Sequence, residues 1–324
     1  MPIRHEGIQT GRSYWEKLPA RGAFAAFPHN RPVNIQLLSD LHLESNPYFK
    51  PWPLPGADVL VLAGDIGSYQ SGSLLTSLAI ADFGLARFSP LPAAQGGAGW
   101  PTPVLFVPGN HEYDGLEFSE ADARLREACQ RLGIVWLERE TVQLQGVRFI
   151  GCTLWTDFDA LTASAGSAAA NSPVALAGQL RQREKAFRAA NFYLKKNHFL
   201  HQGEPALAQG VREESLRSQA WLRSALAMPF DGPTVVVTHF APSLLSADPR
   251  YGLTPGTAGF CNSLDELLPL AKVWLHGHLH CPNDYLRHGC RVVANPLGYA
   301  RKGEQERFRP ALRIAVHQAL GLHS

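Results

Sequence analysis

The feature of this sequence that most constrains its fold is a series of short apolar runs, several of which end in a polar motif. The first three runs are residues 33–39 (VNIQLLS), 59–63 (VLVLA) and 104–107 (VLFV). Their nearly continuous apolar character predicts strands that are covered on both faces. Similar runs predict further strands at residues 134–137, 142–144, 147–154, 234–238, 273–276, 291–294 and 312–316.

Other segments carry apolar residues at the three-to-four spacing of amphipathic helices. These predicted helices cover residues 74–87, 117–132, 179–199 and 213–227. A Pro/Gly-rich stretch at residues 89–103 predicts a surface insertion, and an Ala/Ser-rich stretch at residues 160–172 predicts a mobile loop.

The chain shows no internal repeat and no linker that would divide it. Residues 1–31 are polar, mixed in charge and without clear periodicity, so we expect a loosely attached N-terminal extension. Residues 32–324 are predicted to form a single α/β domain with two facing sheets.

Composition restricts the classes of binding partner and the cellular compartment that we expect. A formal net charge of +2 on 324 residues gives no strong field that would select nucleic acid or an anionic membrane. The five cysteines are odd in number and form no CxxC pair, which favours reduced thiols. No run approaches the roughly 20 apolar residues of a membrane span, and the first residues lack a signal-peptide core. We therefore expect a cytoplasmic protein.

Five polar strings carry the chemistry, and four of them follow a predicted strand. The strings are Asp40-Leu41-His42, Gly64-Asp65, Gly109-Asn110-His111-Glu112, Thr238-His239 and Gly277-His278-Leu279-His280. Ligands of α/β sheets gather beyond the carboxyl ends of strands, so these side chains are expected to meet. Residues i and i+2 of extended chain point the same way, which pairs Asp40 with His42 and His278 with His280. Carboxylates, an amide oxygen and imidazoles together suit a pair of borderline transition metals that hold a phosphate.

Each string alone has a simpler interpretation. Asp40 and Asp65 could cap helices, Asn110 and His111 could form an ordinary Gly-Asn turn, and His239 could be a hydrogen-bonded histidine at a strand end. The order and placement of the whole set favour the metal site.

Neighbouring residues are expected to support this site. We interpret His276 as structural or as support for a ligand, and Glu44, Glu112 and Asp114 as supporting or surface groups. Gly64, Gly109 and Gly277 are expected where the backbone turns sharply or approaches the metals.

The five strings, in this order, resemble the calcineurin-like metallophosphoesterase superfamily, in particular a bacterial branch of single-domain members. The resemblance covers residues 33–300 and implies a four-layer αββα sandwich of two mixed β-sheets flanked by helices. It implies that one metal takes Asp40, His42 and His280 and that Asp65 bridges both metals. The second metal would take Asn110, His239 and His278.

The resemblance also implies a reaction, the hydrolysis of phosphate esters by a hydroxide that bridges the two metals. His111 would be the general acid, and Asn110 and His111 would contact the substrate. Tyr113, Trp155 and Asn295 are further expected to line the substrate cleft. The metals would be a divalent or mixed-valence pair drawn from Mn, Fe, Zn or Co.

A small phosphoester is the expected substrate, with phosphodiesters slightly favoured over the monoesters of small metabolites, and neither nucleic acid nor membrane is expected as a partner. A non-catalytic metal-binding scaffold is the alternative. It is disfavoured because the chain retains every implied ligand as well as His111.

Overall fold

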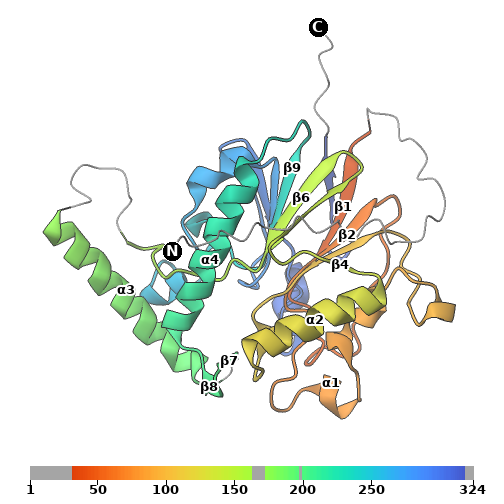
Figure 1. Cartoon of the computed structure of the whole chain (residues 1–324), viewed down its shortest axis with the longest axis horizontal. Coiled ribbons are helices and arrows are strands. Elements are labelled where there is room, and N and C mark those ends of the chain that lie inside the picture. The colour runs from red at the N-terminus through yellow and green to blue at the C-terminus, as the bar shows by residue number, and fades with distance from the viewer. Residues whose placement is uncertain (1–30, 163–171, 197–198, 318–324) are drawn as a thin grey trace, which may run out of the picture.

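The computed structural model describes residues 31–162, 172–196 and 199–317. The predicted N-terminal extension and most of the predicted loop at residues 160–172 lie outside these ranges. The described chain folds into two mixed β-sheets that pack face to face, with helices on their outer faces (Figure 1). This is the predicted four-layer α/β architecture.

The first sheet has five strands, in the order β13-β1-β2-β3-β4. Neighbours from β1 to β4 run parallel, and β13 pairs antiparallel with β1. The strands are β1 (Val33–Leu38), β2 (Val59–Ala63), β3 (Val104–Val107), β4 (Val135–Trp136) and β13 (Arg313–Val316).

The second sheet has six strands, in the order β11-β12-β10-β9-β6-β5. Its four central strands run parallel, and both edge strands run antiparallel to their neighbours. The strands are β5 (Glu140–Leu144), β6 (Val147–Cys152), β9 (Thr234–Thr238), β10 (Val273–His276), β11 (Asn283–Arg287) and β12 (Cys290–Ala294). A separate hairpin joins β7 (Leu200–His201) to β8 (Glu204–Pro205).

The strands alternate their side chains between two cores, as the period of two requires. Leu37 and Val61 of the first sheet and Phe149 and Leu275 of the second belong to the core between the sheets. Leu38 and Phe106, in contrast, belong to the outer core. Both faces of the central strands are thus buried, which explains their continuous apolar runs.

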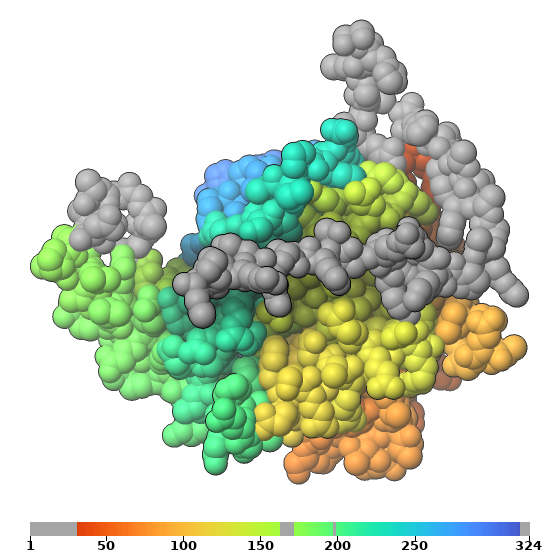
Figure 2. Space-filling view, viewed as in Figure 1, coloured from red at the N-terminus to blue at the C-terminus, as the bar shows by residue number. Residues whose placement is uncertain are grey.

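Three long helices flank the sheets: α2 (Phe118–Leu132), α3 (Pro173–Leu194) and α4 (Ala208–Ala227). Two of them lie on the outer faces, and the third, α3, packs on α4 (Figure 1). Helix α4 contacts β6, and α3 packs against α4 and the 3-10 turn Pro255–Gly259. In the space-filling view, α2 and α4 adjoin on the visible face and α3 forms one edge (Figure 2). None of the described helices combines the length and apolar character that a bilayer crossing requires.

The predicted helix at residues 74–87 is wrong. The chain forms the short helix α1 (Leu74–Ser77) and a separate 3-10 helix, Asp82–Phe88. Ala79, Phe83 and Gly84 take φ values of +50°, +54° and +78°, which a right-handed helix excludes. Leu75, Phe83 and Leu85 are buried, as the apolar spacing predicts, but the backbone turns twice within this segment.

The bounds of two other helices also differ from the prediction. Helix α3 begins at Pro173, where the side chain of Ser172 accepts a hydrogen bond from the Ala175 amide. Helix α4 begins at Ala208 rather than at residue 213. Strand β11 was not predicted, because this edge strand is mostly polar and exposed.

The stretch at residues 89–103 is anchored more firmly than a simple surface insertion. Its tip is exposed, but Trp100 is buried and packs on Phe88 with ring centroids 5.6 Å apart. All five cysteines are buried and free, as the prediction of reduced thiols requires.

Replacing Phe149 with Ala tests the core between the sheets. We expect the free energy of unfolding to fall by about 3–5 kcal/mol, because a buried ring leaves a cavity. Urea denaturation measures this loss. Phe192→Ala on α3, where the side chain is 63% exposed, is the control and should change stability by less than about 0.5 kcal/mol. Equal losses would contradict the assigned core.

Candidate metal centre

The polar strings meet at one end of the two sheets. Asp40, Asp65 and Asn110 lie just beyond the carboxyl ends of β1, β2 and β3. His239 directly follows β9, and His278 lies just beyond β10. Because all these strands are parallel within their sheets, their ends present the side chains to one common space.

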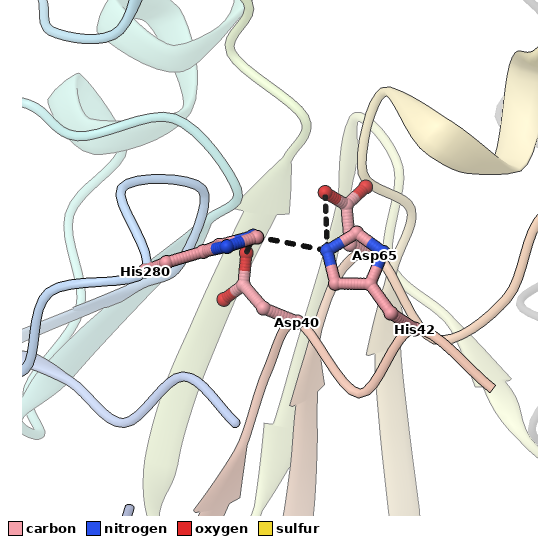
Figure 3. A group of neighbouring side chains, drawn as sticks. All are labelled: Asp40, His42, Asp65 and His280. Carbon is pink, nitrogen blue, oxygen red and sulfur yellow. Dashed lines mark hydrogen bonds and ion pairs between the residues drawn. The ribbon is translucent and has the colours of Figure 1, made fainter. Parts of the chain in front are cut away.

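Two groups of possible metal ligands share one carboxylate. In the first group, ligand atoms of Asp40, His42, Asp65 and His280 all lie within 4.8 Å of one another. Figure 3 shows the ring of His280 pointing toward that of His42, with the two carboxylates beside them.

In the second group, atoms of Asp65, His239 and His278 satisfy the same 4.8 Å limit. Asn110 Oδ1 lies 3.2 Å from His239 Nε2 and so joins this group. The structure therefore brings together all seven residues predicted as ligands, with Asp65 common to both groups.

Three imidazoles present lone pairs to this space. Nδ1 of His42 lies 2.9 Å from a Glu44 oxygen, and Nδ1 of His280 lies 2.6 Å from a Glu304 oxygen. Nδ1 of His239 faces the Ala63 carbonyl at 2.9 Å. These oxygens accept hydrogen bonds, so each Nδ1 donates and each Nε2 of a neutral ring is left as an acceptor.

The acceptors converge without enough donors. His42 Nε2 and His280 Nε2 lie only 2.9 Å apart. Oδ2 of Asp40 and Oδ2 of Asp65 are buried and have no hydrogen-bond partner. Buried acceptors that face one another are destabilising unless a cation lies between them. The residues present therefore fit a pair of metal ions.

The backbone of the site is strained. Asp40, His42, Asp65, His278 and His280 all take positive φ values, which are 53°, 46°, 55°, 71° and 48°. Left-handed backbone is uncommon for residues other than glycine and persists only where the surroundings impose it. Here it turns each side chain away from its strand and toward the shared space.

Glycines allow the loops to approach one another, as expected. A Cβ on Gly109 would lie 2.1 Å from Asp65 Oδ1, and a Cβ on Gly277 would lie 2.5 Å from Asp40 Oδ2. Gly64 also has no room for a side chain, since a Cβ there would lie 2.3 Å from His239 Nδ1.

Glu112 joins two of these loops. Its fully buried carboxylate accepts four backbone N–H groups, from Asp65 at 3.0 Å, Ile66 at 2.5 Å, Gly67 at 3.1 Å and Gly109 at 2.6 Å. Burial, together with the charge of Asp65, raises the pKa of Glu112 to about 7. The sequence indicated a supporting or surface role, but not this clamp.

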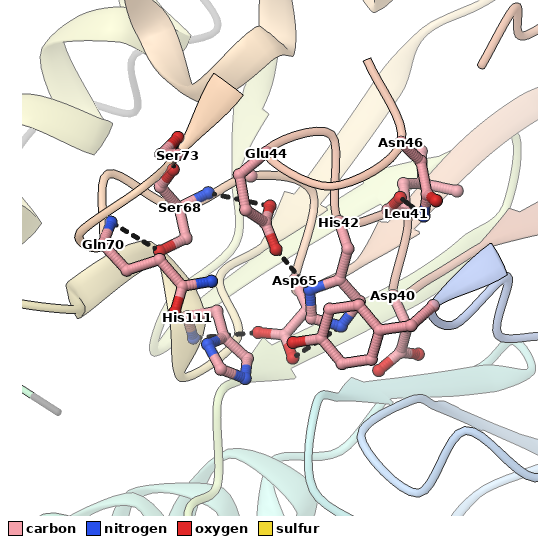
Figure 4. A network of polar contacts seen from close by, with 12 residues as sticks. Asp40, Leu41, His42, Glu44, Asn46, Asp65, Ser68, Gln70, Ser73 and His111 are labelled. Atoms are coloured by element: carbon pink, nitrogen blue, oxygen red, sulfur yellow. Dashed lines mark hydrogen bonds and ion pairs between the residues drawn. The ribbon is translucent and has the colours of Figure 1, made fainter. Parts of the chain in front are cut away.

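His111 lies at the edge of the site. Its backbone N–H donates to Asp65 Oδ1 at 2.9 Å, and its ring Nδ1 contacts Asp114 Oδ2 at 2.6 Å. Ser68 Oγ donates to the same Asp114 oxygen at 2.9 Å. Figure 4 shows His111, Asp65, His42 and Glu44 within this polar network.

Two pKa shifts determine the charges of Asp65 and His111. Burial acts to lower the pKa of His111, but Asp114 and Asp65 raise it well above its ordinary value. Burial acts to raise the pKa of Asp65, but His239, His111 and His42 hold it well below the usual range. The arrangement favours a carboxylate at Asp65 and a protonated ring at His111.

The structure contradicts the expectation that three residues line the substrate cleft. Tyr113, Trp155 and Asn295 are 0%, 1% and 0% exposed. Tyr113 stacks on Phe118 with ring centroids 4.8 Å apart, and its ring lies 5.6 Å from that of Trp155. Asn295 donates to the Leu37 carbonyl. These aromatic and amide groups support the interior instead of facing a substrate.

His276 agrees with the structural interpretation. Its Nδ1 donates to the Gly277 carbonyl at 3.0 Å, and its Nε2 lies 2.9 Å from Ser246 Oγ. Burial lowers the pKa of His276 to about 4, so the ring is neutral. It therefore belongs to neither group of possible ligands.

Glu304 was missed by sequence reasoning. Besides contacting His280, its carboxylate accepts the Tyr299 backbone N–H at 2.8 Å, and the Tyr299 ring stacks on His42 at 4.2 Å. No motif surrounds Glu304. The only available signal was the general need of a ligating histidine for an acceptor on its other nitrogen.

Replacing Glu112 with Gln tests the clamp. An amide offers one oxygen to the four N–H groups, and its NH₂ would face donors. We expect unfolding free energy to fall by about 1–3 kcal/mol for each donor left unsatisfied, and metal affinity to fall about 10–100-fold. Chemical denaturation and metal titration measure both. Glu127→Gln, on the exposed face of α2, should change neither; an unchanged Glu112 variant would exclude the clamp.

Three known proteins illustrate what this chain is similar to. An uncharacterized protein of Acanthamoeba polyphaga mimivirus is 24% identical over 231 residues, which are 67% of this chain and 75% of that protein. The crystal structure of phosphopantetheinyl hydrolase from Mycobacterium tuberculosis shares 21% identity with a TM-score of 0.56, over 90% of this chain and 97% of that chain. A dimetal phosphatase from Danio rerio shares 13% identity with a TM-score of 0.43, over 83% and 88% of the two chains.

The mycobacterial structure has the same fold. The sequence profile of calcineurin-like phosphoesterases, a dimetal-dependent family, matches residues 29–282, which include all five strings of the site. The chain belongs to the calcineurin-like phosphoesterase family.

Proposed function

We propose that this protein hydrolyses phosphodiesters with two bound metal ions. The observation that carries the proposal is the pair of acceptor groups that share Asp65, in which buried carboxylate oxygens of the described chain have no hydrogen-bond partner. Asp40, His42 and His280 hold one ion, and Asn110, His239 and His278 hold the other.

The ions and the protein side chains have different roles in the proposed reaction. When bound, the ions supply positive charge to the phosphate and make hydroxide available near neutral pH. Asp65 fixes the spacing of the two ligand groups. Asn110 adds no negative charge to its group, so the second ion remains more electrophilic than a carboxylate would leave it.

His111 is the proton donor in this proposal. Its ring is directed by Asp114 at 2.6 Å and lies beside His42, with ring centroids 5.1 Å apart. The raised pKa keeps a proton on the ring, and the side chain is 22% exposed, so a leaving-group oxygen can reach it. Transfer of this proton neutralises the alkoxide that departs.

Charge favours diesters over monoesters. Two divalent ions, the carboxylates of Asp40 and Asp65 and one hydroxide leave a net charge near +1, which matches a singly charged diester. Glu44 and Glu304 add negative charge behind the ligands, and this charge disfavours a doubly charged monoester more strongly than a singly charged diester. The name of the similar mycobacterial protein, a phosphopantetheinyl hydrolase, is in keeping with cleavage of a phosphate-linked group.

The test is hydrolysis of bis(p-nitrophenyl) phosphate and p-nitrophenyl phosphate by the Mn²⁺-loaded chain. We expect faster turnover of the diester. Preference for the monoester would replace the proposal with a phosphomonoesterase. Bound metal without turnover of either compound, or of a panel of natural diesters, would favour a non-catalytic metal-binding protein.

His111→Ala should lower kcat by about 100–10,000-fold, because it removes the general acid. Both metals should remain bound, which elemental analysis measures. His201→Ala, an exposed histidine on β7, is the control and should retain full activity. Full turnover by the His111 variant would remove this residue from the mechanism.

Asp65→Ala should abolish activity and reduce the metal content, because it removes the carboxylate common to both ligand groups. Isothermal titration with Mn²⁺ measures the second effect independently of catalysis. Two metals bound at unchanged affinity would show that Asp65 is not the bridge.

A further inference from the structure

A surface depression lies beside the loop that carries His280. Its volume is about 740 Å³, and strand β11 and the segment at residues 307–309 form opposite parts of its lining. Arg287, Arg307 and Arg309 line it together with Asp284 and Tyr285. None of these residues has a part in the chemistry described above.

The lining concentrates positive charge. Three arginines against one aspartate leave a formal charge of +2 in the depression, which equals the formal net charge of the whole chain. Arg309 and Arg287 lie 3.8 Å and 3.6 Å from their carboxylate partners, which is too far for strong hydrogen bonds. Arg307 has no ion-pair partner within 4.0 Å among the described residues, and its charge acts on Asp248 and on the thiol of Cys281. The guanidinium groups can therefore donate to a ligand.

Two segments connect the depression to the metal centre. His280 is followed closely by Pro282 and Asn283, which line the depression. Asn283 fixes this loop by donating to the carbonyls of Ser246 at 3.1 Å and Cys281 at 3.0 Å. A ligand in the depression therefore contacts the loop that continues from His280.

The second segment is the 3-10 helix Glu304–Arg307. It begins at Glu304, which contacts His280 Nδ1 at 2.6 Å, and it ends at Arg307 in the depression. A 3-10 helix rises about 2 Å per residue, which separates the two backbone positions by roughly 6 Å. Arg307 is thus one helical turn from the carboxylate that contacts His280.

The size and lining indicate the class of ligand. A volume of about 740 Å³ exceeds what a single phosphate requires and is typical of sites for small organic molecules. Tyr285 and Leu245 supply apolar surface, and the arginines supply paired donors that match phosphate oxygens.

We propose that this depression holds a second, distal phosphate of the substrate, with Arg307 as its principal contact. The inference rests on the proposed function, since it assigns the part of the substrate that the metal centre does not hold. The substrate is then a phosphodiester whose organic arm carries a further phosphate group.

Two series of p-nitrophenyl alkyl phosphodiesters test this assignment. In one series the alkyl chain ends in a phosphate, and in the other it ends in a hydroxyl; chain lengths vary within both. We expect KM to be lower by about tenfold or more for the phosphate series at one preferred length, because two charge-assisted hydrogen bonds are gained. The value of kcat should differ little.

Arg307→Ala should remove this difference in KM and leave the hydroxyl series unchanged. Arg188→Ala, an exposed arginine on α3 that pairs with Glu184, is the matched control and should affect neither series. Equal KM values for the two series at every length, or a difference that persists in Arg307→Ala, would overturn the assignment.

Binding separates this inference from the proposed function. If the chain hydrolyses neither series, the proposed function fails, and calorimetric titration with the same compounds tests the depression alone. Tighter binding of the phosphate series that depends on Arg307 would support the distal phosphate site. Equal affinities for the two series would exclude it.

Discussion

The site depends on one buried carboxylate that is not itself a candidate ligand. Glu112 accepts four backbone N–H groups from the loops after β2 and β3. These loops carry Asp65 and Asn110, which belong to different strands of one sheet. The second sheet adds His239 and His278 from the opposite side. Glu112 therefore fixes the loop that carries Asp65 relative to the loop that carries Asn110.

The acceptor groups of the site repel one another. Acceptor atoms of His42, His280, Asp40 and Asp65 converge. Two buried carboxylate oxygens of the described chain have no hydrogen bond, although Asp65 Oδ2 lies 3.1 Å from His239 Nε2. Cations that bind only the folded chain relieve this repulsion, and their binding free energy adds to that of folding. We therefore expect the stability of this protein and its proposed catalysis to depend on the same ions.

The sequence predicted the parts of the structure that follow from burial. The runs at residues 33–39 and 104–107 became central strands because both of their faces are covered. The seven predicted ligands came together because parallel strands end at one edge. Apolar spacing alone could not reveal the left-handed backbone at Ala79 and Phe83, which interrupts the predicted helix at residues 74–87. Nor could it distinguish a buried Tyr113 from one that faces a cleft, since both are compatible with the same motif.

The left-handed backbone of Asp40, His42, Asp65, His278 and His280 has a consequence for evolution and engineering. Such a conformation costs about 1–2 kcal/mol for a residue that carries a Cβ. Glycine at these positions would relax the backbone and remove the crowded acceptors at once. The apo chain would then be more stable in a form that binds no metal. Selection for stability alone would therefore erase this site, and its persistence requires selection for what the site does.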